Sequence, residues 1–97
     1  MKKILIVDDN ESNLYMLETL LKGEGFEVVS AVNGKEALEK ALLAPPDLIV
    51  TDVLMPVMDG YTLCKQWKSE DALRSIPLVI YTATYTDPEN EAFALSL

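Results

Sequence analysis

Residues 3–9 read KILIVDD, in which an unbroken apolar run from Ile4 to Val7 ends in two adjacent aspartates, Asp8 and Asp9. A short, uninterrupted apolar run is typical of a strand that is buried on both faces of a parallel sheet. It is too short for the core of a signal peptide or for a membrane span, so we expect a cytoplasmic location. We therefore predict a central strand here, with carboxylates at its end.

The rest of the chain repeats an alternation of strand and helix. Further strands are predicted at residues 26–32, 47–52 and 78–81, and helices from residue 11 to Gly23 or Gly25, from the cap Asn33 to Pro45, around residues 63–67, and from Asp87 onward. This alternation, without linker or repeat, predicts one doubly wound α/β domain with a parallel sheet over residues 1–97. The segment 26–32 mixes polar with β-branched residues and suits an edge, which gives the strand order 2-1-3-4.

The charge of the chain narrows the choice of partners. Eight basic residues stand against sixteen acidic ones, which gives a net charge of −8, and there is no histidine. Nucleic acid and anionic membranes would repel such a chain, so we predict neither as a partner. Chemistry that needs a histidine must take that group from another molecule. The single cysteine, Cys64, excludes an internal disulfide.

Polar side chains follow three of the predicted strands: Asp8 and Asp9 after the first, Asp52 at the end of the third, and Thr82 after the fourth. In the order 2-1-3-4 these ends meet near the switch point between the first and third strands, where ligands bind in such folds. Two carboxylates about 5 Å apart repel by roughly 3 kcal/mol at an effective dielectric constant of about 20, so a cation is expected between them. Oxygen donors without soft ligands favour Mg²⁺ over zinc.

Beside such an ion, one carboxylate could act as a nucleophile toward a phosphoryl group. Asp52 is the best candidate because it stands alone at the end of a central strand, whereas the adjacent Asp8 and Asp9 are better placed to hold the ion. The Thr82 hydroxyl could donate a hydrogen bond to a phosphoryl oxygen. Taken singly, each of these residues could also serve only a loop or a helix cap.

Three segments, ILIVDDN at residues 4–10, LIVTDVLMP at 48–56 followed by MDG at 58–60, and PLVIYTA at 77–83, resemble in order and spacing the receiver domain of two-component response regulators. The resemblance covers the whole chain and implies a flavodoxin-like fold. It also implies that Asp52 is the phosphoacceptor of a phosphorelay, modified by a sensor histidine kinase or a histidine phosphotransfer protein. The receiver itself would catalyse this Mg²⁺-dependent transfer and the later dephosphorylation, and no other reaction.

The resemblance further implies that Asp9 and Asp52 ligate Mg²⁺ directly, together with the backbone carbonyl of Leu54. Asp8 would act mostly through water, and Thr82 would be the hydroxyl that switches partner interactions when Asp52 is phosphorylated. The missing histidine is then explained, since in this family it lies on the donor protein.

The chain departs from the family at its end. Receivers continue into a fifth strand, which carries a lysine, and a fifth helix, and both are absent here. The apolar strand at residues 78–81 would then be a bare edge, which soluble proteins avoid. We therefore expect that residues 1–97 are a C-terminally incomplete receiver domain, or that this edge pairs with another molecule, such as a second copy in a homodimer.

Two other functions fit parts of the pattern. A receiver-like module could bind partners without phosphorylation, and would then be indifferent to Mg²⁺ and to Asp52. A phosphohydrolase of the aspartyl-phosphate kind fits less well, because it would need an Asp-x-Asp arrangement after the first strand. Tyr81, Tyr85 and Phe93 could form a signalling surface near the fourth strand and the last helix, or could equally belong to the core.

Overall fold

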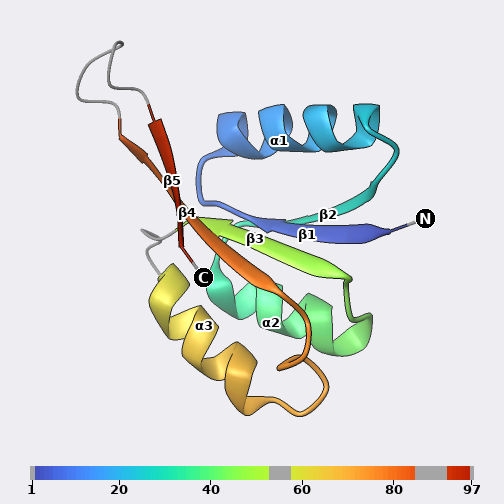
Figure 1. Cartoon of the computed structure of the whole chain (residues 1–97), viewed down its shortest axis with the longest axis vertical. Coiled ribbons are helices and arrows are strands. Elements are labelled where there is room, and N and C mark those ends of the chain that lie inside the picture. Colours follow the sequence, from blue (N-terminus) through green and yellow to red (C-terminus); the bar gives the residue numbers. More distant parts are fainter. Residues whose placement is uncertain (1, 53–57, 85–91, 97) are drawn as a thin grey trace.

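The computed structural model describes residues 2–52, 58–84 and 92–96, with side chains as far as Tyr81. Its elements in chain order are β1 (Lys3–Val7), α1 (Glu11–Gly23), β2 (Glu27–Ala31), α2 (Gly34–Leu43), β3 (Leu48–Asp52), α3 (Gly60–Ser69), β4 (Leu78–Thr84) and β5 (Ala92–Ser96). The first four strands pair in parallel in the order β2-β1-β3-β4, which confirms the predicted sheet. Helix α1 lies on one face, and α2 and α3 lie on the other (Figure 1). No helix in the described ranges is long and apolar enough to cross a membrane.

The last element differs from the prediction. The helix expected from Asp87 begins in residues 85–91, which lie outside the described part, but Ala92–Ser96 forms strand β5. This strand pairs antiparallel with β4, from Ile80 opposite Ser96 to Thr84 opposite Ala92. The helix prediction is therefore wrong for these five residues, because the open edge of β4 offers a row of backbone donors and acceptors that outweighs a weak local preference. The edge expected to be bare, or paired with another molecule, is paired within the chain.

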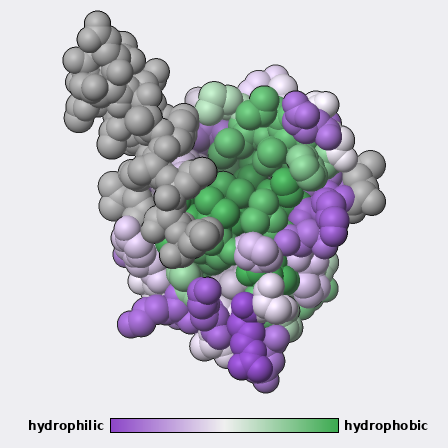
Figure 2. Space-filling view, in the orientation of Figure 1, coloured by the Kyte–Doolittle hydropathy of each residue, from purple (hydrophilic) through white to green (hydrophobic). Residues whose placement is uncertain are grey.

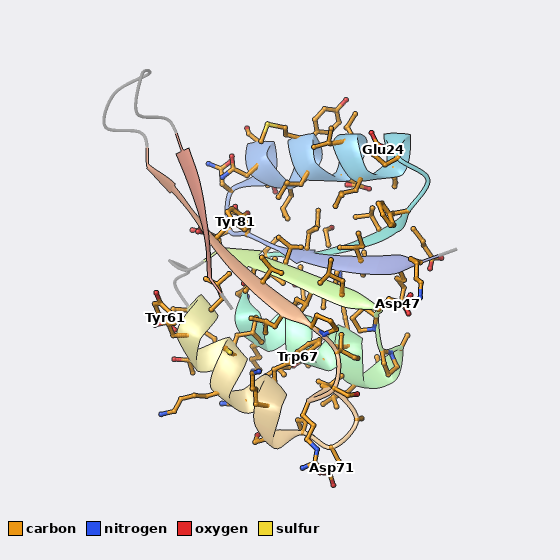
Figure 3. The ribbon with its side chains drawn as sticks, in the orientation of Figure 1. Glu24, Asp47, Tyr61, Trp67, Asp71 and Tyr81 are labelled. Carbon is orange, nitrogen blue, oxygen red and sulfur yellow. The ribbon has the colours of Figure 1, made fainter. Side chains whose placement is uncertain are left out.

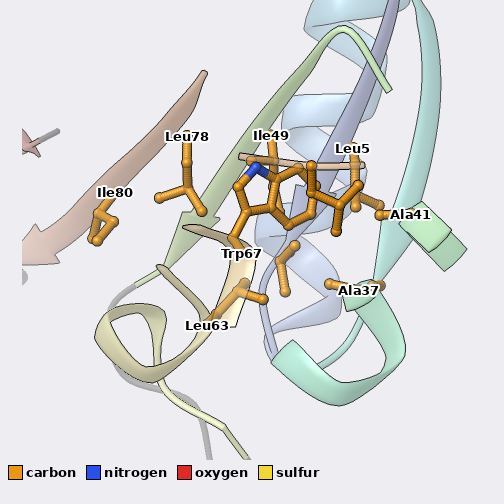
Figure 4. Packing of buried hydrophobic residues seen from close by; sticks show 11 residues of the cluster. Leu5, Ala37, Ala41, Ile49, Leu63, Trp67, Leu78 and Ile80 are labelled. Atoms are coloured by element: carbon orange, nitrogen blue, oxygen red, sulfur yellow. The ribbon is translucent and has the colours of Figure 1, made fainter. Parts of the chain in front are cut away.

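The two faces of the sheet bury two separate clusters. Side chains alternate along a strand, so Leu5 and Val7 of β1 face α2 and α3, whereas Ile4 and Ile6 face α1. All four are nearly inaccessible to solvent, as the apolar run predicted. The larger cluster packs around Trp67 of α3 (Figure 4). Its buried residues are Leu5, Val7, Ala31, Ala37, Ala41, Ile49, Leu63, Trp67, Leu73, Leu78 and Ile80.

The cover on the α1 side of the sheet is less complete. Leu48 and Val50 of β3 pack against the smaller cluster but remain partly exposed. Figure 2 shows a broad hydrophobic area, hollowed near its centre, on the face of the molecule that it displays. One helix therefore leaves part of this face of the sheet open in the chain as described.

The three helices in the described part of the chain each begin at a side-chain cap. Asn10 Oδ1 accepts a hydrogen bond from the backbone N–H of Asn13 at 3.0 Å, and Asn33 Oδ1 accepts one from Glu36 at 2.8 Å. The cap at Asn33 was predicted. Asp59 caps α3 by accepting a hydrogen bond from the Thr62 N–H at 2.7 Å. These caps fix where the helices start relative to the carboxyl ends of the strands.

Trp67 provides a test of the larger cluster. Its side chain is fully buried, and its indole Nε1 donates to the carbonyl oxygen of Ile76 at 3.1 Å. We expect Trp67→Ala to lower the free energy of unfolding by about 3–5 kcal/mol, since it leaves a large cavity. Urea denaturation followed by far-UV circular dichroism measures this loss. Tyr61→Ala, on the exposed side of the same helix, is the control, and an equal loss in both variants would contradict the packing described.

Asp59 provides a test that depends on pH. The backbone N–H of Thr62, and then its hydroxyl, hold the pKa of Asp59 below the ordinary value of 3.8. A carboxyl group whose pKa is lower in the folded state stabilises the fold above its unfolded pKa, and this contribution is lost as the pH falls through the folded value. We therefore expect Asp59→Ala to be less stable than the parent at neutral pH, with the difference narrowing below pH 3.8.

The measurement is the free energy of unfolding of both proteins over a series of pH values. Asp71→Ala removes another acid, one whose side chain is 91% exposed, and serves as the control. A difference between parent and Asp59→Ala that stays constant with pH would show that the charge of the cap contributes nothing.

Candidate functional site

The parallel register brings the ends of three strands together. The pairing of β1 with β3 ends at Val7 and Thr51, so the next residues along, Asp8 and Asp52, lie opposite each other. Asp52 is paired in turn with Tyr81 of β4. Since side chains alternate along each strand, this row projects from the face of the sheet that α1 covers. Figure 3 shows Tyr81 at this end of the sheet, near the beginning of α1.

Asp8, Asp9 and Asp52 form one acidic cluster. Each offers a carboxylate oxygen, and these three oxygens all lie within 4.8 Å of one another. The convergence predicted from the sequence is therefore present. Exposure differs sharply within the cluster, because Asp8 is fully buried, Asp52 is half-buried and Asp9 is exposed. Solvent and a dissolved ion can reach the cluster from the side of Asp9.

The buried carboxylate of Asp8 is surrounded by hydrogen-bond donors. Its Oδ1 accepts from the backbone N–H of Asn10 at 2.9 Å. Its Oδ2 accepts from the Asn13 side-chain amide at 3.1 Å and from the hydroxyl of Tyr81. A buried charge is tolerated when it is hydrogen-bonded in this way. Asp8 is therefore held by the loop after β1, by the first turn of α1 and by β4.

The sequence did not identify Asn13 and Tyr81 as members of the site. The sequence left two roles open for Tyr81, a signalling surface or the core, and its 3% exposure places it in the core and not on such a surface. The available signal was a tyrosine directly after the aliphatic residues 78–80 of a buried strand, because a buried tyrosine usually finds a partner for its O–H. Tyr85 lies outside the described residues, as does the side chain of Phe93.

The remaining predicted residues lie at the limits of the described structure. Thr82 follows Tyr81 in β4 and is paired with Ala94 of β5, and its side chain is outside the described part. Leu54 belongs to residues 53–57, which are also outside it. Met58, the first described residue after this gap, packs against Gly34 at the start of α2. A Cβ on that glycine would lie only 2.8 Å from the methionine side chain.

The cluster suits a hard divalent cation. Oxygens bound to one octahedral Mg²⁺ ion lie about 3–4 Å apart, and the three carboxylate oxygens here lie within 4.8 Å of one another. All three donors are carboxylates, and Mg²⁺ typically binds carboxylate oxygens together with phosphate oxygens. Asp8, Asp9 and Asp52 could therefore hold a magnesium ion at the carboxyl end of the sheet.

Comparison with known proteins gives a consistent result. The family model of the response regulator receiver domain matches residues 4–96 of this chain. The response regulator PleD of Caulobacter vibrioides is 46% identical over 81 residues, which are 84% of this chain and 18% of PleD. The receiver domain of a signal transduction histidine kinase from Syntrophus aciditrophicus is 40% identical, with a TM-score of 0.82 over 92% of this chain and 67% of that one.

A further solved relative bears on the acidic cluster. The receiver domain of the sensor histidine kinase PA1611 from Pseudomonas aeruginosa, solved with a magnesium ion coordinated in its active-site cleft, is 28% identical, with a TM-score of 0.81 over 91% of this chain and 72% of that one. The parallel sheet, the acidic residues at its carboxyl end and the match over nearly the whole length lead to one conclusion. This chain belongs to the receiver domain family of two-component response regulators.

Proposed function

We propose that Asp52 is a phosphoacceptor and that it takes its phosphoryl group from a phosphohistidine on a sensor kinase or a histidine phosphotransfer protein. The observation that supports this proposal most directly is the convergence of Asp8, Asp9 and Asp52 within 4.8 Å. Phosphorylation would switch the interactions of the domain with its partners. Residues 1–97 would act as one receiver domain, in the cytoplasm, where the proposed donor proteins present their phosphohistidine.

The burial of the acids suggests how they divide the work. Asp9 is exposed and Asp52 is half-buried, so both are accessible to a hydrated ion and would bind Mg²⁺ directly, with the Leu54 carbonyl. Asp8 is buried and already accepts three hydrogen bonds, so it would act through a water molecule. When bound, Mg²⁺ neutralises the charge on the oxygens of the transferred group. The magnesium ion in the cleft of the PA1611 receiver supports this assignment.

In the transfer, a carboxylate oxygen of Asp52 would attack the phosphorus in line with the bond to the donor imidazole. The new O–P bond forms as the N–P bond breaks, and the imidazole nitrogen keeps the electron pair. The product is an acyl phosphate at the end of β3, and the Thr82 hydroxyl would donate a hydrogen bond to one of its oxygens. Residues 1–97 contain no histidine, so the phosphohistidine would lie outside this receiver domain.

The first prediction from this function concerns Asp52. Incubated with Mg²⁺ and a phosphohistidine donor protein, the parent chain should become phosphorylated, as measured by intact mass spectrometry, and Asp52→Asn should not. Asp59→Asn, which makes the same charge change at the cap of α3, is the matched control and should be phosphorylated like the parent.

Two results would contradict the phosphoacceptor function. One is the absence of modification and of beryllofluoride binding in the parent, and the other is undiminished modification of Asp52→Asn. A chain whose folding and partner binding are unaffected by Mg²⁺ and by Asp52→Asn would instead be a binding module that works without phosphorylation.

The second prediction concerns Asp9. Because this exposed carboxylate would be a direct ligand, Asp9→Asn should weaken Mg²⁺ binding by at least about tenfold, as measured by isothermal titration calorimetry. Asp71→Asn changes another exposed acid, outside the cluster, and should leave the affinity unchanged. Equal affinity of the parent and Asp9→Asn for Mg²⁺ would exclude Asp9 as a ligand.

A further inference from the structure

Tyr81 makes a contact that spans the sheet. Its backbone belongs to β4, and its hydroxyl donates to Asp8 at the end of β1, although β3 lies between these two strands. Neighbouring strands are about 4.8 Å apart, so the side chain must bridge a separation of about 10 Å together with Asp8. A phenol is long enough to do this across Asp52, which occupies the same row on β3.

Asn13 donates to the same carboxylate oxygen of Asp8 as Tyr81 does. Its side-chain amide and the Tyr81 hydroxyl both donate to Asp8 Oδ2, one from α1 and the other from β4. The Asn10 N–H holds the other oxygen, Oδ1. With both oxygens bonded from three parts of the chain, a carboxylate as buried as Asp8 has little freedom to rotate.

From this geometry we propose that Tyr81 is a positioning residue of the acidic cluster. Together with Asn13 it holds Asp8 so that the three carboxylates are assembled before Mg²⁺ arrives, and the inference rests on the metal binding proposed above. Tyr81 also directly precedes Thr82 in β4. The same hydrogen bond therefore links the metal site to the strand that carries the proposed switch hydroxyl.

The role of the hydroxyl can be separated from that of the ring. Tyr81 is 3% exposed, and a phenylalanine would fill the same space while removing the hydroxyl that donates to Asp8. Groups that orient a metal ligand without touching the metal typically contribute about 10–100-fold to metal affinity. We therefore expect Tyr81→Phe to weaken Mg²⁺ binding by about tenfold while the protein remains folded.

The experiment compares Mg²⁺ binding by isothermal titration calorimetry in the full chain and its variants. Tyr81→Phe and Asn13→Ala remove the two donors to Oδ2, and both should weaken binding. Tyr15→Phe removes a hydroxyl from a tyrosine of α1 that is 73% exposed, and it should bind Mg²⁺ like the parent. Far-UV circular dichroism and thermal unfolding without Mg²⁺ establish that each variant is folded.

A double-mutant cycle with Asp8→Asn distinguishes positioning from a general loss of stability. If Tyr81 acts through Asp8, Tyr81→Phe has no further effect on Mg²⁺ affinity once Asp8 is replaced. A change of less than about twofold in Tyr81→Phe, or an equal change with and without Asp8→Asn, would overturn the inference. If the parent itself does not bind Mg²⁺, both the proposed function and the role of Tyr81 are contradicted. If the parent and Tyr81→Phe bind Mg²⁺ equally well, only the role of Tyr81 is contradicted.

Discussion

The parallel register between β1 and β3 is the constraint on which the site depends. It sets Asp8 opposite Asp52, and the register of β3 with β4 adds Tyr81 to the same row. A shift of one residue in either pairing would turn the following side chain to the other face of the sheet, because the side chains alternate. The apolar clusters on both faces hold this register, since a slip of one residue would exchange the β1 side chains between the two clusters and disrupt the packing of both.

The cost of gathering three acids is offset by hydrogen bonds. Two carboxylates about 5 Å apart repel by roughly 3 kcal/mol at an effective dielectric constant of about 20, a large amount beside the 5–15 kcal/mol typical of domain stability. Hydrogen bonds to charged groups contribute about 1.5–3 kcal/mol each, and Asp8 accepts three of them. The network around Asp8 therefore opposes the repulsion between this buried carboxylate and its two neighbours.

Much of this arrangement could be predicted from local patterns. The unbroken apolar run of β1 indicated burial on both faces, and the polar segment around β2 indicated an edge. Asn33 marked the start of α2. Aspartates placed directly after strands indicated the acidic cluster, because all carboxyl ends of a parallel sheet meet at the same edge. These features depend on neighbours in the sequence and on rules that hold for any parallel sheet.

The sequence by itself determined the alternation of strands and helices, the parallel order β2-β1-β3-β4 and the meeting of Asp8, Asp9 and Asp52. Only the tertiary structure decided that Ala92–Ser96 is a strand, because that depends on the open edge of β4 and not on local preference. It also decided that Asp8 is buried while its neighbour Asp9 is exposed, and that Tyr81 reaches Asp8. Tyr81 and Asp8 are 73 positions apart in the sequence, and no local periodicity records their contact.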